Sequence, residues 1–160
     1  MNLEELKNRL ETLEAVEAIK KLKARYCQRA DERDAEGFAN LFTEDGVFEG
    51  GTFGRGQGRA GVATFLRGVQ QQSLPFALHY VMNPIIEVQG DTATGRWYLL
   101  EPCTMVAEGT QAQQAVWGTA RYEEEYVKVK GEWKFKKVHL MPVFWSPFDQ
   151  GWVKKKFVGQ

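Results

Sequence analysis

The side chains best suited to moving protons in this chain of 160 residues are its two histidines, His79 and His139. A neutral imidazole can take a proton from a carbon next to a carbonyl group when a carboxylate holds its other nitrogen and steadies the imidazolium that forms. His79 stands in a run of apolar and aromatic residues, where burial of an unpartnered ring is costly. We therefore expect a carboxylate or a hydroxyl group close to His79.

Asp31 is the best candidate for that carboxylate, because it falls at the edge of the apolar face of the first predicted helix. Tyr26 lies on the same face, five positions earlier. Each residue also has an ordinary structural interpretation. Asp31 would be a solvated carboxylate in the charged cluster 31–34, His79 a core histidine bonded to a backbone carbonyl, and Tyr26 a core aromatic. The pattern alone leaves these alternatives open.

The elements that must position these residues begin with a long helix over residues 3–30, where apolar residues recur at intervals of three and four. At about 100° per residue, the apolar residues of 3–13 and of 16–30 point in directions roughly 90° or more apart. The early turns are therefore expected to contact a partner subunit. Two shorter helices are predicted at 34–42 and 59–71, with a turn at 43–46 and a short strand at 47–48.

Glycines dominate residues 50–61, and Gly56 to Gly61 matches the dinucleotide-binding motif G-x-G-x-x-G. A dinucleotide fold requires a parallel strand after the helix and further βαβ units, which the rest of the chain does not offer. A flexible loop at the rim of a cavity is the favoured interpretation.

Four long alternating segments, rich in aromatic and β-branched residues, follow Pro75. They predict an antiparallel meander of strands at 76–88, 93–107, 112–129 and 133–144. Both faces of the first of these strands are largely apolar, so we expect it to be buried on both sides. Helices first and strands afterwards predict an α+β domain in which helices cover one face of a curved sheet.

Composition limits the classes of protein and partner. With 43% apolar residues, residues 1–160 suffice for a single domain with its own core. The 21 basic and 21 acidic residues balance, which favours a small ligand over nucleic acid or a membrane surface. Cys27 and Cys103 lack the spacing of a metal site or a disulfide framework, so no metal is expected. No basic start leads into an apolar run, and a cytoplasmic protein is expected.

The motifs together resemble the SnoaL-like branch of the nuclear transport factor 2 (NTF2)-like fold over residues 13–144. The resemblance rests on Tyr26-x4-Asp31, His79-Tyr-x-x-Asn83, the strand 95–99 and the hairpin 122–135. Bile-acid dehydratases, scytalone dehydratase, hexachlorocyclohexane dehydrochlorinase and, more distantly, ketosteroid isomerases belong to this group. The resemblance implies a cone-shaped α+β fold, with N-terminal helices packed on a curved, mainly antiparallel sheet.

The resemblance also implies roles for individual residues. The interval between Asp31 and His79 matches a catalytic dyad in the bile-acid dehydratase and the dehydrochlorinase, with His79 as the base and Asp31 holding it. Tyr26 matches a tyrosine of the bile-acid dehydratase and would donate to a leaving hydroxyl or a carbonyl oxygen, and Glu101 occupies the place of an acidic residue. The late-strand arginine of both enzymes has no counterpart, because Pro142 or its neighbours stand at the aligned position. The substrate is therefore not defined.

We expect a mainly aromatic cavity that needs no cofactor and takes a small hydrophobic substrate, such as a steroid, polyketide or terpenoid ring. His139 would either line the cavity or face solvent among lysines. The function expected is that of a cofactor-independent lyase, most simply a dehydratase. The alternatives are an isomerase or cyclase that uses the same dyad, and a non-catalytic ligand-binding or dioxygenase-small-subunit-like domain. A homodimer or homotrimer is expected. The residues expected to bind the substrate are Asn83, Trp97, Leu99, Glu101, Trp117, His139, Phe144 and Trp145.

Overall fold

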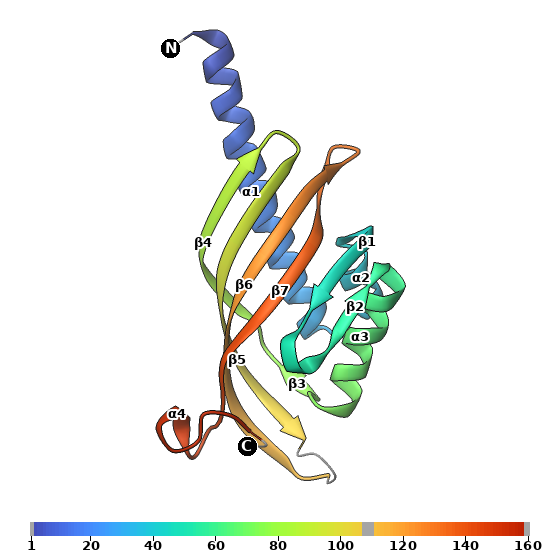
Figure 1. Cartoon of the computed structure of the whole chain (residues 1–160), viewed down its shortest axis with the longest axis vertical. Helices are drawn as coiled ribbons and strands as arrows, with labels where there is room; N and C mark the ends of the chain where they lie inside the picture. Colours follow the sequence, from blue (N-terminus) through green and yellow to red (C-terminus); the bar gives the residue numbers. More distant parts are fainter. Residues whose placement is uncertain (1, 107–110, 159–160) are drawn as a thin grey trace.

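The computed structural model describes residues 2–106 and 111–158, with most helical residues in the first half of the chain and the long strands in the second (Figure 1). The predicted α+β architecture is confirmed. The elements, in chain order, are α1 (Leu3–Asp31), α2 (Ala35–Ala39), β1 (Phe42–Glu49), the short 3-10 helix η1 (Gly51–Phe53), β2 (Arg55–Gln57), α3 (Gly58–Gln72), β3 (Phe76–Ala77), β4 (Tyr80–Gln89), β5 (Thr92–Val106), β6 (Gln113–Val129), β7 (Glu132–Pro147) and α4 (Gly151–Lys154).

The long helix α1 has two parts with different surroundings. A capping box starts it, in which the Asn2 side chain accepts from the Glu5 backbone N–H and the Glu5 carboxylate accepts from that of Asn2. The first turns project beyond the sheet (Figure 1), with their leucines between 50% and 83% exposed. The later turns are buried on one face, which includes Ile19, Leu22 and Tyr26. Within the described residues, no helix is both long enough and apolar enough to cross a bilayer.

The strands form one curled sheet in the order β2-β1-β7-β6-β5-β3, with β4 paired to β5 (Figure 1). The long strands β5, β6 and β7 are antiparallel, and only β1 runs parallel to its neighbour β7. Alternate residues of β5 and β6 are buried, and those of β6 contact α1. The core therefore lies between the later turns of α1 and the inner face of the sheet.

The second helix is shorter than the sequence predicted, and the first strand is longer. The Asp34 side chain caps α2 by accepting from the Gly37 N–H at 2.8 Å. Phe42, expected at the end of this helix, instead begins β1 and is fully buried, with its ring centroid 5.2 Å from that of Phe135. The predicted turn at 43–46 is an irregularity within β1, where the register against β7 shifts. Packing against β7 thus overrides helical spacing.

The glycine-rich segment is not a loop, because η1, β2 and the first turn of α3 lie within it. Gly56 brings β2 against α3: a Cβ atom at this position would lie 2.7 Å from the Val62 Cα atom. β2 is antiparallel to β1, so the segment lacks the parallel βαβ arrangement of a dinucleotide site. Gly56 thus serves close packing, whereas Gly51, Gly54 and Gly58 adopt a positive φ.

The strand predicted at 76–88 is interrupted and half exposed. Leu78 and His79 separate β3 from β4, and Asn83 has a φ of 54° where the register against β5 shifts. Phe76 and Tyr80 are 51% and 53% exposed, so the prediction that this strand is buried on both faces is wrong. Its inner face contacts α1, whereas its outer face remains open. The predicted end of the next strand, at residue 107, lies outside the described residues.

Candidate active site

A cavity of about 160 Å³ lies between the end of α1, α3 and the inner face of the sheet. Most of its wall is apolar, which favours a hydrophobic ligand. Polar side chains reach its wall from several elements. Tyr26 and Asp31 belong to α1, His79 lies between β3 and β4, Glu101 belongs to β5 and Tyr122 to β6, and Arg33 and Gln70 also line it. The other main lining residues are Phe38, Phe48, Phe53, Phe65, Leu66, Val69, Leu74, Ala77, Leu140 and Trp145.

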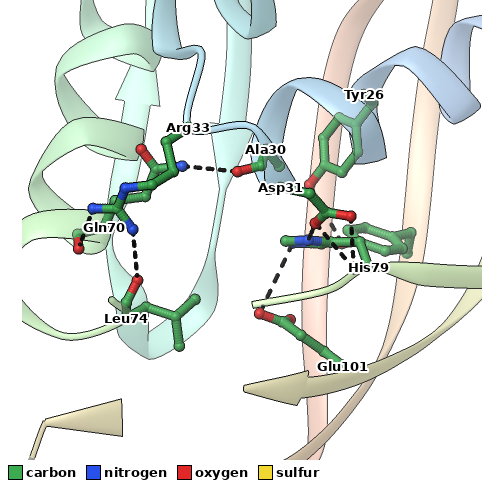
Figure 2. A network of polar contacts seen from close by, with 9 residues as sticks. Tyr26, Ala30, Asp31, Arg33, Gln70, Leu74, His79 and Glu101 are labelled. Carbon is green, nitrogen blue, oxygen red and sulfur yellow. Dashed lines mark hydrogen bonds and ion pairs between the residues drawn. The ribbon is translucent and has the colours of Figure 1, made fainter. Parts of the chain in front are cut away.

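Asp31 holds His79 at two points (Figure 2). Its Oδ1 atom lies 2.7 Å from the His79 Nδ1 atom and accepts from the His79 backbone N–H at 3.1 Å. An ionised carboxylate can only accept, so this contact places the ring proton on Nδ1 and leaves a lone pair on Nε2. The His79 side chain is 13% exposed. The geometry is that of an oriented base.

Glu101 approaches the other nitrogen of the same ring, with its Oε1 atom 3.9 Å from the His79 Nε2 atom (Figure 2). Burial raises the pKa of the Glu101 carboxyl; the Asp31 charge adds to this effect, while His79 opposes it. Burial is also the largest effect on the pKa of His79 and lowers it, but the carboxylates of Glu101 and Asp31 together outweigh burial, and the pKa is raised. Glu101 and Asp31 therefore make His79 a stronger base.

Two phenols stand beside the dyad. The Tyr26 hydroxyl donates to that of Tyr122 across 3.3 Å, and the Tyr26 ring lies edge-on to His79, with centroids 6.3 Å apart. Burial raises the pKa of both tyrosines well above its ordinary value, so both hydroxyls stay protonated. Because one mutual bond uses one of their two hydrogens, the pair keeps one O–H for a ligand.

A buried ion pair supports the two phenols. Lys23 donates to Glu124, and both side chains are completely buried. The Lys23 Nζ atom lies 3.9 Å from the ring centroid of Tyr26 and 3.4 Å from that of Tyr122, which are cation–π distances. Glu124 also accepts from the Tyr126 hydroxyl. The ammonium thus fixes the faces of both cavity tyrosines.

Sequence reasoning missed this pair because lysine and glutamate runs usually face solvent. A signal was present. Lys23 falls between Leu22 and Tyr26 on the buried face of α1, and Glu124 alternates with Tyr122 and Tyr126 along β6. When two apolar faces that pack together each carry one charged residue, of opposite sign, the two residues are expected to form a buried ion pair.

Arg33 lines the cavity and is hydrogen-bonded to the backbone around the end of α3 (Figure 2). Its guanidinium donates to the carbonyl oxygens of Gln70 and Pro75, both at 2.8 Å, and to that of Leu74 at 3.4 Å. Gln70 in turn donates to the Ala30 carbonyl at 3.0 Å. These bonds join the end of α1 to the end of α3, and Arg33 is therefore occupied by backbone oxygens.

Five of the predicted site residues line the same cavity: Tyr26, Asp31, His79, Glu101 and Trp145. Trp97 and Leu99 share the inner strand face with Glu101, as alternation predicted, but they do not line the cavity. They lie deeper in the core, where the Trp97 Nε1–H donates to Tyr126 at 2.9 Å. Both residues are buried in the core, and of these three inner residues of β5 only Glu101 lines the cavity.

Four further residues expected at the cavity lie on the outer side of the sheet. Asn83 is exposed at the bulge of β4, and His139 alternates with the buried Val138 and Leu140 of β7. Trp117 and Phe144 are each one position away from an inner residue, so the pleat turns them outward. Their rings pack against Phe148 and Trp152 respectively.

Comparisons with known proteins agree with this architecture. The family model described as a SnoaL-like domain matches residues 11–139. Among curated proteins, no match was found. Among solved structures, hexachlorocyclohexane dehydrochlorinase LinA-type3 from Novosphingobium barchaimii is 25% identical with a TM-score of 0.78, covering 88% of this chain and 94% of that one.

Two other solved structures are similar. A Mycobacterium tuberculosis protein of unknown function is 27% identical with a TM-score of 0.69, over 82% of this chain and 73% of that one. A putative scytalone dehydratase from Novosphingobium aromaticivorans is 24% identical with a TM-score of 0.70, over 86% of this chain and 89% of that one. Since the neighbours include an NTF2-like protein, the predicted cone-shaped fold is confirmed.

Proposed function

Because this chain belongs to the SnoaL-like domain family, whose model matches residues 11–139, we propose that it is a lyase. It would eliminate water from a hydrophobic cyclic substrate, with the chain's own side chains as the only catalytic groups. The observation that carries the proposal is the contact of 2.7 Å between His79 and Asp31 at the wall of an apolar cavity. The similarity to a dehydrochlorinase supports an elimination reaction.

The proposed reaction starts at the Nε2 atom of His79. This nitrogen takes a proton from the carbon next to a carbonyl group, and the electrons of the broken C–H bond form an enolate. The free O–H of the phenol pair donates to the enolate oxygen. As the electrons return, the C–O bond to the leaving hydroxyl breaks, and His79 gives this hydroxyl its proton. Water leaves, and the dyad regains its starting state.

Asp31 contributes by fixing the ring and by stabilising the imidazolium during the reaction. General base catalysis contributes on the order of 10²- to 10⁴-fold to such a rate. The rest of the acceleration must come from holding the substrate in a dry cavity, where hydrogen bonds to the developing charge are stronger than in water. The largely apolar wall supplies that environment.

The cavity volume of about 160 Å³ favours a compact substrate. An apolar cavity of about 150 Å³ in another protein holds one benzene molecule, whereas sites for drug-sized ligands span roughly 300–1,000 Å³. A single six-membered ring therefore fits this chain better than the four fused rings of a steroid. Of the predicted substrate classes, small polyketide or terpenoid rings are favoured.

An isomerase is the second candidate, and Glu101 is the observation that favours it. Its buried carboxyl lies 3.9 Å from the His79 Nε2 atom, close to where a proton leaves the substrate. A second proton carrier at this position could return a proton to a different carbon of the enolate. The same dyad would then move a double bond without loss of water.

Incubation with 3-hydroxycyclohexanone in D₂O tests these proposals. The lyase predicts hydrogen exchange next to the carbonyl together with formation of cyclohexenone, both lost in His79→Ala and kept in His139→Ala, which removes the outer histidine. Exchange without water loss, and double-bond migration in an unsaturated ketone, would favour the isomerase. If a panel of compact cyclic ketones binds but reacts no faster than with His79→Ala, the domain is a ligand-binding module.

A further inference from the structure

The indole N–H of Trp145 is a buried donor without a partner. Trp145 is 4% exposed and lines the cavity. Among the buried side-chain nitrogen and oxygen atoms of residues 2–106 and 111–158, its Nε1 atom alone lacks a hydrogen-bond partner. Most buried polar groups in folded proteins are paired, so a lone donor at the wall of a cavity calls for an explanation.

The register of the sheet shows where this donor lies. Gly118 of β6 is paired with Glu101 of β5 on one side and with Trp145 of β7 on the other. A Cβ atom on Gly118 would lie 2.6 Å from the Trp145 Cε2 atom and 2.9 Å from Nε1. The indole therefore lies across Gly118, with its nitrogen edge over β6, next to the strand that carries Glu101. Any side chain at this position would displace it.

The neighbours of the indole do not satisfy its N–H. The Phe53 ring meets it edge to face, with centroids 5.3 Å apart, and offers no acceptor atom. The other neighbour is the Cys103 thiol. The indole interacts with its sulfur, which lowers the pKa of the thiol, but burial outweighs this effect and raises that pKa well above its ordinary value. The thiol therefore stays neutral, and a neutral sulfur is only a weak acceptor. Neither neighbour is thus a strong acceptor for the indole N–H.

The charges around the cavity limit the ligand that could supply this acceptor. Arg33, which lines the cavity, is occupied by three backbone carbonyls, and His79 is held by Asp31. Glu101 would repel an anion whenever it is ionised. Among the lining residues that the structure describes, no cation is therefore left for a carboxylate or phosphate, and a neutral acceptor suits the site better.

We propose that the Trp145 N–H is the donor of a subsite for a neutral acceptor, namely the carbonyl oxygen of a compact cyclic ketone. This subsite deepens the proposed function and rests on it for the class of substrate. Trp145 and Glu101 both line the cavity, and both are paired with Gly118 in the sheet. A carbonyl bound to the indole N–H would therefore lie on the side of the cavity where the Glu101 carboxyl faces His79 at 3.9 Å. The carbons adjacent to the carbonyl would then face the base.

A pair of matched ligands tests the subsite without any turnover. Cyclohexanone and methylenecyclohexane have nearly the same shape, but only the ketone accepts a hydrogen bond. In ¹H–¹⁵N NMR spectra, cyclohexanone should shift the Trp145 indole N–H resonance downfield to saturation, and methylenecyclohexane should not. The absence of this signal in Trp145→Phe assigns it. An unmoved resonance when cyclohexanone saturates the cavity would overturn the subsite.

The ratio of the two ligand affinities separates the hydrogen bond from a change in cavity volume. Trp145→Phe should weaken ketone binding by about 2- to 10-fold relative to methylenecyclohexane, the range expected for one hydrogen bond. Trp97→Phe is the control, because it removes a buried indole whose N–H already has a partner outside the cavity; its ratio should match the wild type. An unchanged ratio in Trp145→Phe would contradict the proposal. Ketone binding through Trp145 without proton exchange would leave the subsite standing and refute the lyase.

Discussion

The Nδ1 atom of His79 lies 2.7 Å from the Oδ1 atom of Asp31, although 48 positions separate the two residues in the chain. Both residues lie where a secondary-structure element ends. α1 ends at Asp31, and Leu78 and His79 separate β3 from β4. Leu78 still donates its backbone N–H to the Pro102 carbonyl of β5, whereas the His79 backbone N–H donates to the Asp31 carboxylate. Two donors on one carboxylate fix both the position and the tautomer of the ring.

Asp31→Asn should keep the fold and lose most of the proposed activity. The amide is almost isosteric with the carboxylate, but it carries no charge to stabilise an imidazolium and favours the wrong tautomer of His79. We expect proton exchange into a bound ketone to fall on the order of 10²- to 10⁴-fold. Asp91→Asn, at an exposed turn, is the matched control. Equal rates in Asp31→Asn and wild type would exclude the dyad.

At acidic pH, kcat/KM should increase as the pH rises. His79 acts as a base only when its Nε2 atom is unprotonated, and its pKa is raised above the ordinary value of about 6.5. The midpoint of kcat/KM against pH is therefore expected above 6.5. Glu101 is the largest of the effects that raise this pKa, so Glu101→Gln should move the midpoint to lower pH. A midpoint that stays in place would show that Glu101 does not act on the base.

The same raised pKa has a consequence for stability. Because folded His79 binds its proton more tightly than unfolded histidine does, its contribution is complete below about pH 6.5 and is lost as the pH rises through the folded pKa. The difference in unfolding free energy between wild type and His79→Ala, from urea titrations, should shrink over that range. If the difference in unfolding free energy instead grows as the pH rises, the pKa of His79 is lowered by folding and not raised.

Lys23→Met should destabilise the chain strongly, because it leaves the Glu124 carboxylate buried without its cation. Removal of one partner of a buried pair costs about 3–5 kcal/mol. Lys23→Met combined with Glu124→Gln should recover much of this loss, since the glutamine oxygen still accepts from Tyr126. Urea unfolding measures both variants. A double variant as unstable as the single one would show that charge isolation is not the cause.

Gly118→Ala should also destabilise the fold, because the new Cβ atom would lie 2.6 Å from the Trp145 ring. Overpacking of this kind costs about 1–3 kcal/mol. Gly68→Ala is the matched control: no atom lies within 4 Å of its added Cβ, and alanine is favoured in the middle of α3 by about 1 kcal/mol. Thermal unfolding should therefore move in opposite directions, and equal shifts would exclude crowding at Trp145.

The leucines of the first turns of α1 suit contact with a second copy of the chain. Leu6 and Leu10 are 50% and 55% exposed on the part of the helix that extends past the sheet. Leu6→Glu with Leu10→Glu should leave the fold intact and dissociate the expected homo-oligomer, as measured by sedimentation. Glu11→Gln, at a neighbouring exposed position, is the control. An unchanged oligomer would place the interface elsewhere.

The sequence by itself predicted the main helices and the long strands, whereas the pairing of Asp31 with His79 was an expectation from the family resemblance. The helical period fixed α1, and the alternation of β5, β6 and β7 fixed the meander, because each pattern must bury its apolar residues on one face. The position of Glu101 on the inner face followed from the same alternation. These features depend on local spacing, which a single chain reveals.

Only the tertiary structure decided where the cavity begins and which residues line it. Trp97 and Leu99 lie on the correct face but do not line the cavity, and a one-residue difference in pleat turned Trp117 and Phe144 outward while Gly118 and Trp145 face in. The pairing of Lys23 with Glu124 likewise depends on α1 lying over β6. Such contacts join residues distant in the chain, and their energies depend on packing and burial that local spacing does not specify.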